Sequence, residues 1–191
     1  WECDDARWPP IPAQDFSKFG PIDTAPLPRI KKVSGPFLHR SWLNVPHVTH
    51  NDEADITDLD RYRKELDTAA KDDRDPYRVT LLAFLVKACV AALKEFPEFN
   101  SSLSPEKDAL ILKRYYNIGI AVDTPGGLVV PVVKDADTLN IRGIASAIAT
   151  KAAAARAKEL SNKEMQGSTF TITNPGPFAS YASSPIINQP N

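Results

Sequence analysis

Cysteine and methionine are scarce in this 191-residue chain. Its two cysteines, Cys3 and Cys89, are far apart and form neither a metal-ligand nor a redox spacing. Cys89 lies in an apolar run, which is typical of a small core residue, and two isolated thiols fit a reducing compartment. The only methionine is Met165 and the first residue is Trp1, so we expect a processed protein or a fragment of a longer one.

Long apolar runs and an excess of one charge are also lacking. The most apolar stretch, residues 80–93, is interrupted by Lys87 and is too short to span a bilayer, and no signal peptide is visible. The formal net charge is −1, which argues against nucleic acid and anionic membranes as partners. We therefore expect a protein without a membrane or nucleic-acid partner, in which local charge holds any anionic ligand.

Histidine occurs only at His39, His47 and His50. A strand would place His47 and His50 on opposite faces, and no cysteine lies nearby, so we predict no metal site. We expect structural roles for all three histidines, with a general base among them as the alternative. A glycine-rich phosphate loop is absent as well, because Gly126-Gly127 has the character of a turn.

Proline is abundant at the start of the chain and indicates an extended arm or linker over residues 1–28, followed by a folded domain over 29–191. Three aromatic residues, Trp8, Phe16 and Phe19, lie in this arm. A pure spacer rarely contains aromatic side chains. The arm therefore either lies on another surface or brings its aromatics back onto its own domain.

The first half of the domain shows mainly helical patterns. Residues 38–43 suggest a short helix and 47–56 a strand with one polar face. Thr57 and Asp60 resemble an N-cap pair that opens a helix with apolar side chains at helical spacing. A second, largely buried helix begins near Thr80 and stops before Pro97.

The second half combines strands with one long helix. Strand-like runs cover residues 110–116, 118–122 and 128–133, and the turn at 124–127 predicts a hairpin between the last two. An alanine-rich helix is expected over 140–160 and a final strand over 169–173. This irregular alternation predicts an α/β fold, a mixed-sheet two-layer sandwich, rather than a doubly wound parallel sheet.

Two short segments carry hydroxyl groups that suit chemistry. Thr173 and Asn174 end the last expected strand, where a hydroxyl can donate to a developing oxyanion. Residues 99–103 place three small polar side chains between apolar ones, which fits a capped turn or a polar channel. Taken singly, both segments also fit ordinary structure.

Together, several separated blocks resemble one family. They are 38–49 (LHRSWLNVPHVT), 54–57 (ADIT), 99–102 (FNSS), 117–124 (NIGIAVDT) and 165–174 (MQGSTFTITN). In this order they resemble the catalytic domain of the dihydrolipoamide acyltransferases, the core components of 2-oxo acid dehydrogenase complexes. The first blocks are most similar to the acetyltransferases of pyruvate dehydrogenase complexes. The FTITN block and residues 184–190 are equally similar to the succinyltransferases of 2-oxoglutarate complexes.

The resemblance implies a chloramphenicol acetyltransferase-like fold and acetyl transfer between dihydrolipoamide and coenzyme A. It also implies homotrimers within a larger core, an active site at the subunit interface, and partners that include a lipoyl domain and the other subunits of the complex. Coenzyme A would be a substrate, and the lipoyl group would sit on an upstream domain. The alternatives are succinyl transfer, a non-catalytic scaffold, and an antibiotic-inactivating acetyltransferase, which the proline-rich arm disfavours.

The resemblance also implies roles for individual residues. Thr173 matches the hydroxyl that stabilises the tetrahedral oxyanion, and Arg63 matches a position associated with the 3′-phosphate of coenzyme A. The alternative for Arg63 is an ion pair on a helix surface. Substrate or cofactor contacts are further expected from Asn100, Ser101, Ser102 and Asn174. Arg40 is expected to order the site, and Asp123 is a recurrent acid of the family whose role stays open between catalysis and structure.

The sequence departs from the family in two places. The family's catalytic histidine lies in an Asp-His-Arg motif downstream of the strand that ends at Thr173, and no such motif occurs here. We therefore expect that the C-terminal part of the domain is missing and that the chain alone is inactive. Pro175 and Pro177 also replace a glycine-rich turn. The expected location is the bacterial cytoplasm, with the mitochondrial matrix as the alternative.

Overall fold

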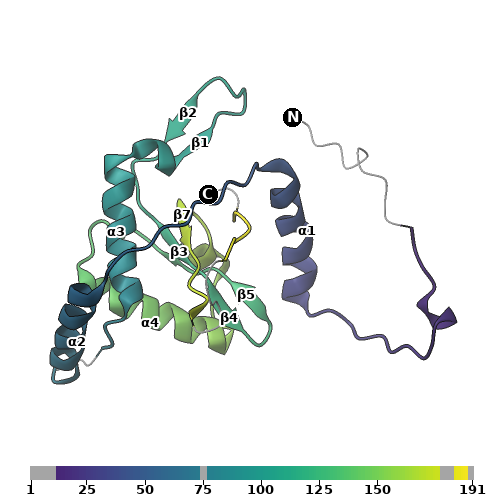
Figure 1. Cartoon of the computed structure of the whole chain (residues 1–191), viewed down its shortest axis with the longest axis horizontal. Helices are drawn as coiled ribbons and strands as arrows, with labels where there is room; N and C mark the ends of the chain where they lie inside the picture. The colour runs from purple at the N-terminus through teal and green to yellow at the C-terminus, as the bar shows by residue number, and fades with distance from the viewer. Residues whose placement is uncertain (1–11, 74–76, 177–182, 189–191) are drawn as a thin grey trace.

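The computed structural model describes residues 12–73, 77–176 and 183–188 of the chain, shown as a ribbon in Figure 1. Its elements are, in order, η2 (Phe16–Lys18), α1 (Arg29–Asn44), α2 (Thr57–Lys71), α3 (Leu81–Glu95), η3 (Pro97–Asn100), β1 (Ser101–Leu103), β2 (Leu110–Leu112), β3 (Ile118–Ile120), β4 (Val122–Thr124), β5 (Gly127–Val129), β6 (Val132–Val133), α4 (Ile141–Ala157), η4 (Asn162–Met165) and β7 (Phe170–Ile172). No described helix is both long and apolar enough to cross a membrane.

The central sheet is small and mixed. Its strand order is β6-β3-β7, with β6 antiparallel and β7 parallel to β3. The parallel pair places Ile118 opposite Phe170 and Ile120 opposite Ile172. Between β3 and β7 the chain forms β4, β5, β6 and helix α4, which supply the long crossover that this parallel pairing requires. The mixed sheet predicted from the sequence is thus present.

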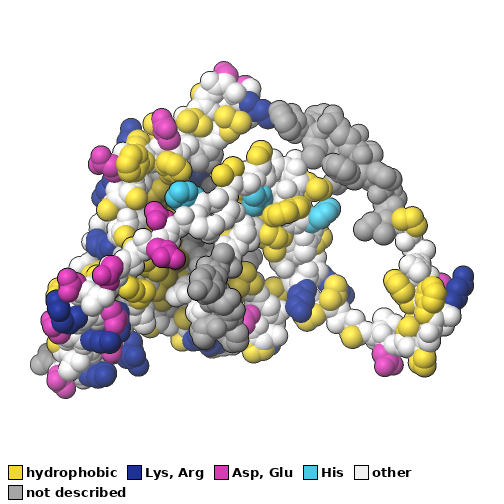
Figure 2. Space-filling model, viewed as in Figure 1, with side chains coloured by type: hydrophobic (Ala, Val, Ile, Leu, Met, Phe, Trp, Pro, Cys, Tyr) yellow, Lys and Arg dark blue, Asp and Glu magenta, His cyan; other side chains and the backbone are white. Residues whose placement is uncertain are grey.

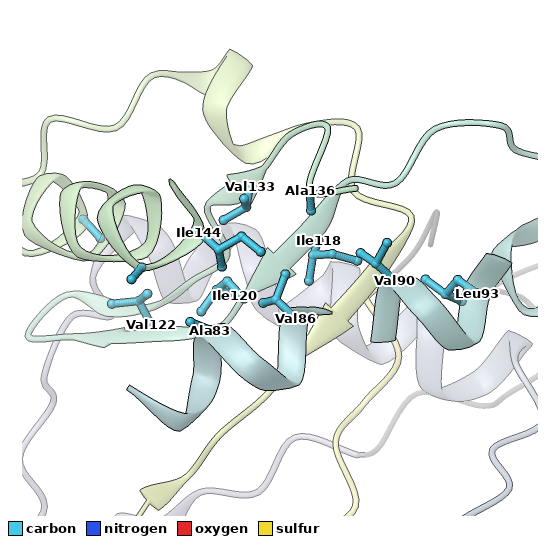
Figure 3. Packing of buried hydrophobic residues seen from close by; sticks show 12 residues of the cluster. Ala83, Val86, Val90, Leu93, Ile118, Ile120, Val122, Val133, Ala136 and Ile144 are labelled. Atoms are coloured by element: carbon cyan, nitrogen blue, oxygen red, sulfur yellow. The ribbon is translucent and has the colours of Figure 1, made fainter. Parts of the chain in front are cut away.

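One layer of helices covers this sheet. Helix α3 buries its small and β-branched positions, Ala83, Val86 and Val90, against Ile118 of β3 and Ile144 of α4 (Figure 3). Its apolar circumference had indicated a buried helix, and the helix ends at Glu95, before Pro97, as predicted. Fully burying a side chain such as valine or isoleucine contributes roughly 1.5–3 kcal/mol. These contacts therefore hold the two layers together.

The turn at residues 124–127 forms the predicted hairpin between β4 and β5, in which Asp123 pairs with Leu128. Thr124 closes the turn by donating from its hydroxyl to the carbonyl oxygen of Gly127 over 2.6 Å. Gly127 has a φ of +128°, which few L-residues adopt, so glycine is required at this point. The remainder of the predicted third run, past Pro131, forms β6 instead.

Helix α1 is longer than the short helix predicted over 38–43, because it starts at Arg29 and continues through Pro36. A proline disfavours helical backbone in the residue before it by colliding with that residue's backbone N–H and Cβ. Here that residue is Gly35, which has no Cβ, so one of the two clashes is absent. Ile30 anchors the first turn of α1 against Gly126 and Gly127 of the hairpin, and this tertiary contact was invisible in the local pattern.

The strand predicted over 47–56 is wrong, since these residues belong to no helix or strand. They cross the face of the molecule in extended form between α1 and α2 (Figure 1). The predicted N-cap at Thr57 is also wrong, because Thr57 is already helical. Asp55 instead accepts the Thr57 N–H at 2.9 Å, and hydrogen bonds from Thr57 hold the pKa of that carboxyl below its usual range.

The described part of the arm exposes its aromatic side chains. Phe16 and Phe19, in and directly after η2, are 61% and 75% exposed. Asp15 caps this short turn by accepting the Ser17 N–H at 3.1 Å. The expectation that the arm brings its aromatics back onto its own domain is therefore not met for these two residues, and contact with another surface stays a prediction. Trp8 lies outside the described residues.

Candidate active site

Strand β7 and the residues on either side of it present three threonines to one cavity. Side chains alternate along a strand, so Thr169, Thr171 and Thr173 share a face, and all three line a cavity of about 240 Å³ together with Ser101. The remaining lining residues are mostly apolar: Phe99, Phe170, Pro185, Ile186, Ile187 and Asn188. A hydroxyl-lined cavity with apolar walls suits a neutral reacting group that develops negative charge on an oxygen.

Asn117 fixes the start of β7. Its side-chain Nδ2 donates to the Gly167 carbonyl oxygen at 2.8 Å, while its Oδ1 accepts the Asp135 N–H at 2.9 Å. Its backbone carbonyl oxygen accepts the Thr169 N–H at 2.7 Å. One side chain just before β3 therefore sets where the threonine strand enters the sheet. Sequence reasoning did not single out Asn117 for this role.

Gly119 lets β7 lie close to β3. A Cβ placed on Gly119 would lie 2.9 Å from Val130 Cγ1 and 3.0 Å from Thr171 Oγ1. Both distances leave no room for a methyl group at the middle of the sheet. At the far end of the strand, the Ala121 N–H donates to the Ile172 carbonyl oxygen at 3.0 Å, directly before Thr173. The position of Thr173 is thus set by the sheet.

Asn174 faces a different cavity from that of its neighbour Thr173. This second cavity, of about 400 Å³, is lined by Asn174 and Asp123 together with Leu82 of α3 and Arg156 of α4. Asn174 Oδ1 accepts the Gly176 N–H at 3.0 Å, which closes the turn after β7. The structure therefore brings Asn174 and Asp123 together, but separates both from the cavity of Thr173 and Ser101.

A family model for the 2-oxoacid dehydrogenases acyltransferase catalytic domain matches residues 20–191 of this chain. The chain belongs to this family. The acetyltransferase component of the pyruvate dehydrogenase complex of Cupriavidus necator is 48% identical over 181 residues, which are 95% of this chain and 32% of that protein. The component of Pseudomonas aeruginosa is 47% identical over 182 residues, covering 95% and 33%. The chain thus spans about a third of the length of these relatives.

Solved structures agree with this assignment. The dihydrolipoamide acetyltransferase of Azotobacter vinelandii is 45% identical and superposes with a TM-score of 0.92, covering 96% of this chain and 74% of that chain. A structure of the cubic core of the pyruvate dehydrogenase multienzyme complex is 46% identical, with the same TM-score and coverage. The predicted chloramphenicol acetyltransferase-like sandwich of this acyltransferase domain is confirmed.

Arg63 of the acyltransferase domain is engaged in contacts within its own chain. Its Nε lies 2.8 Å from Asp60 Oδ1, and one terminal nitrogen donates to the Val79 carbonyl oxygen at 3.1 Å. The side chain is only 19% exposed. This geometry is the ion pair that stood as the alternative to a phosphate contact, and it also ties α2 to the start of α3.

The three polar residues expected in the substrate channel have separate positions. Asn100 is fully buried, and its Nδ2 donates to the carbonyl oxygens of Lys113 and Tyr115 at 2.8 and 3.1 Å. Ser101 lines the cavity of Thr173, and its hydroxyl donates to the Glu98 carbonyl oxygen at 2.6 Å. Ser102 pairs with Ile111 in the β1–β2 ribbon. The position of Ser101 therefore fits the channel, whereas Asn100 holds the base of the ribbon.

Arg40 and the histidines lie elsewhere in the structure. Arg40 is exposed on α1, with its guanidinium carbon 5.5 Å from the centre of the Phe37 ring, and lines neither cavity described above. His39 and His50 are exposed, whereas His47 is half-buried and hydrogen-bonded. Across the described residues, no group of three or more histidine, cysteine or acidic side chains could hold a metal ion.

Proposed function

We propose that the full protein transfers an acetyl group between dihydrolipoamide and coenzyme A, and that Thr173 donates to the oxyanion. The observation that carries this proposal is the position of Thr173 at the end of β7, where it lines a cavity together with other hydroxyl-bearing residues. A positioned donor of this kind is worth roughly 3 kcal/mol in the transition state. Coenzyme A is a substrate in this proposal.

The chemistry needs a base, an attacking sulfur and an oxyanion donor. The base removes the proton of the thiol, and the sulfur attacks the carbonyl carbon of the thioester. The carbonyl oxygen then carries the negative charge that Thr173 would stabilise. Collapse of the tetrahedral intermediate re-forms the carbonyl and expels the other sulfur as a thiolate, which takes up the proton from the base. The two thiols exchange one acyl group without any redox change.

We assign the base to a histidine outside this sequence. Both ring nitrogens of His47 are hydrogen-bonded within the chain, and His39 and His50 do not line the cavity of Thr173. The solved Azotobacter structure concerns the role of a serine, a histidine and an asparagine in the catalytic mechanism of that enzyme. Thr173 would supply here a hydroxyl of the kind that a serine offers.

The lining of the Thr173 cavity favours acetyl over succinyl as the acyl group. A succinyl group carries a carboxylate, and a buried charge is costly unless a cation pairs with it. The described lining contains no lysine, arginine or histidine, and includes Phe99, Pro185 and Ile186 instead. A methyl group gains from contact with such walls, because apolar surface leaves water.

We further propose that the domain assembles with copies of itself into a homotrimer and a larger core, which also recruits lipoyl domains and the other subunits of a bacterial, cytoplasmic complex. The β1–β2 ribbon supports self-assembly. Its side chains at Leu103, Leu110 and Ile111 are each more than half exposed. Clustered exposed apolar side chains of this kind are typical of surfaces that become covered in an assembly.

Substitution of the hydroxyl tests the proposed function. In the assembled full-length protein, Thr173→Val keeps the β-branched shape and removes the donor. We expect kcat to fall about 100-fold while KM changes little, because the lost hydrogen bond forms only in the transition state. Thr150→Val on the exposed surface of α4 is the matched control and should leave both constants unchanged. A normal rate in Thr173→Val would refute the assignment of the donor.

A further inference from the structure

His47 joins two distant parts of the chain. Its Nδ1 lies 2.6 Å from the Val45 carbonyl oxygen, and its Nε2 accepts the Ile187 N–H at 3.1 Å. A carbonyl oxygen can only accept and a backbone N–H can only donate, so the ring is neutral with its proton on Nδ1. The Trp42 ring packs against it with ring centres 5.0 Å apart. The histidine therefore acts as a fixed hydrogen-bond acceptor.

The partner of this acceptor belongs to a wall of the candidate active site. Residues 185–188 line one side of the same cavity that Thr173 lines. A second contact holds the same stretch, because the hydroxyls of Thr49 and Ser184 are 2.9 Å apart. The extended segment after α1, on the face where Figure 2 shows the three histidines, therefore fastens this wall on both sides of Pro185 and Ile186.

We propose that His47 is a positioning residue that sets the width of the Thr173 cavity and thereby the length of acyl chain it accepts. This inference rests on the proposed function. His47 does not line the cavity itself and acts through the backbone of Ile187. While the bond to Nε2 is made, Ile186 and Ile187 stay close to the threonine row. Once the bond is lost, the wall can move outward and admit a longer chain.

The closing experiment compares acyl donors in the assembled full-length protein. His47→Phe keeps a ring against Trp42 but removes the acceptor, whereas His47→Gln offers an amide oxygen in place of Nε2. The measured quantity is kcat/KM for acetyl-coenzyme A divided by kcat/KM for butanoyl-coenzyme A, with dihydrolipoamide as the acceptor. Loss of one neutral hydrogen bond should lower this ratio about three- to tenfold in the phenylalanine variant.

Two controls separate positioning from general damage. The glutamine variant should recover most of the acetyl preference, and His50→Phe, a change at an exposed histidine nearby, should leave the ratio unchanged. General loss of structure would lower both rates together and leave their ratio intact. An unchanged ratio in a folded His47→Phe protein would overturn the proposal. If that variant does not fold, Thr49→Val removes the second contact, and the ratio should then fall about twofold; an unchanged ratio there overturns the proposal equally.

A second readout does not depend on catalysis. Hydrogen exchange of a peptide covering residues 183–188 should become faster in His47→Phe than in the wild-type protein, because the Ile187 N–H loses its acceptor. If the wild-type protein transfers no acetyl group, the proposed function fails, while this exchange measurement still tests the hydrogen bond between His47 and Ile187. If transfer is normal and exchange is unchanged, the inference about His47 fails alone.

Discussion

Replacing Gly119 by alanine should destabilise the domain through a single methyl group. Gly119 is buried at the centre of β3, between Val132 of β6 and Thr171 of β7. The added Cβ would meet Val130 Cγ1 at 2.9 Å, Thr171 Oγ1 at 3.0 Å and Ser168 Cβ at 3.4 Å. Contacts shorter than about 3.5 Å between carbon atoms are repulsive, so a strand or a side chain must shift.

The expected size follows from two opposing effects. Overpacking a well-packed core costs about 1–3 kcal/mol. Alanine also loses less backbone entropy than glycine on folding, which returns about 0.4–1 kcal/mol where the native φ is accessible. Gly119 is outside the left-handed region, so this gain applies. We expect a net loss of about 1–2 kcal/mol, and a fall in Tm of about 2–8 °C for a chain of this length.

Urea unfolding of the domain, followed by far-UV circular dichroism, measures this loss directly. Gly143→Ala in α4 is the matched control, because its Cβ would make only ordinary contacts of 3.4–3.5 Å with Leu139 and Asn140. That change should stabilise the domain by about 0.5–1 kcal/mol, as expected for a glycine inside a helix. Equal stability of Gly119→Ala and the wild-type protein would refute the close approach of β7 to β3.

Three further outcomes are expected. The Val79 N–H donates to the Asp67 carboxylate and holds the pKa of that carboxyl below its usual range. Its contribution to stability is therefore present above about pH 4 and is lost as pH falls through the lowered pKa. Asp67→Asn should weaken the pH dependence of the unfolding free energy, measured with urea, over this acidic range. If the observed ion pair is the role of Arg63, Arg63→Gln should lower stability and change KM for coenzyme A and for dephospho-coenzyme A equally in steady-state assays. A rise in KM confined to coenzyme A would instead support a contact with the 3′-phosphate. Asn140→Ala should lower stability by about 1 kcal/mol in thermal unfolding, because its side chain caps α4 at the Gly143 N–H.

Local patterns predicted the elements whose causes are local. Helix α3 is apolar around most of its circumference, and α4 lies in an alanine-rich run, so both were recognisable from the sequence. The β4–β5 hairpin follows from the turn chemistry of Thr124 to Gly127. The mixed sheet followed from the irregular order of helices and strands, although the parallel pairing of β3 with β7 needed the structure.

The errors occur where distant residues decide the local structure. The segment around His47 and Thr49 alternates like a strand, yet its partners are Ile187 and Ser184 near the other end of the chain. These contacts are made by side chains, so no sheet ladder forms. The first turns of α1 were missed because Ile30 is held by the hairpin glycines, which lie about a hundred positions later.

The candidate site was predicted in part for the same reason. Strand alternation alone would have placed Thr169, Thr171 and Thr173 on one face and Asn174 on the other. It could not show that Ser101 faces the same cavity, since that depends on how η3 and β7 pack. Asn100 was expected to contact substrate, but its amide closes the ribbon by bonding to backbone more than ten positions later.

Stability and catalysis meet at β7, and substitutions there can separate the two. Gly119 and Asn117 act on the whole strand, so changes at either position should lower stability and move the end of β7 together. Thr173 is exposed after the last ladder position, so removing its hydroxyl should cost activity and leave stability nearly unchanged. A Thr173→Val protein that lost both would mean that its hydroxyl belongs to the fold, and the oxyanion donor would then have to be sought elsewhere in the cavity.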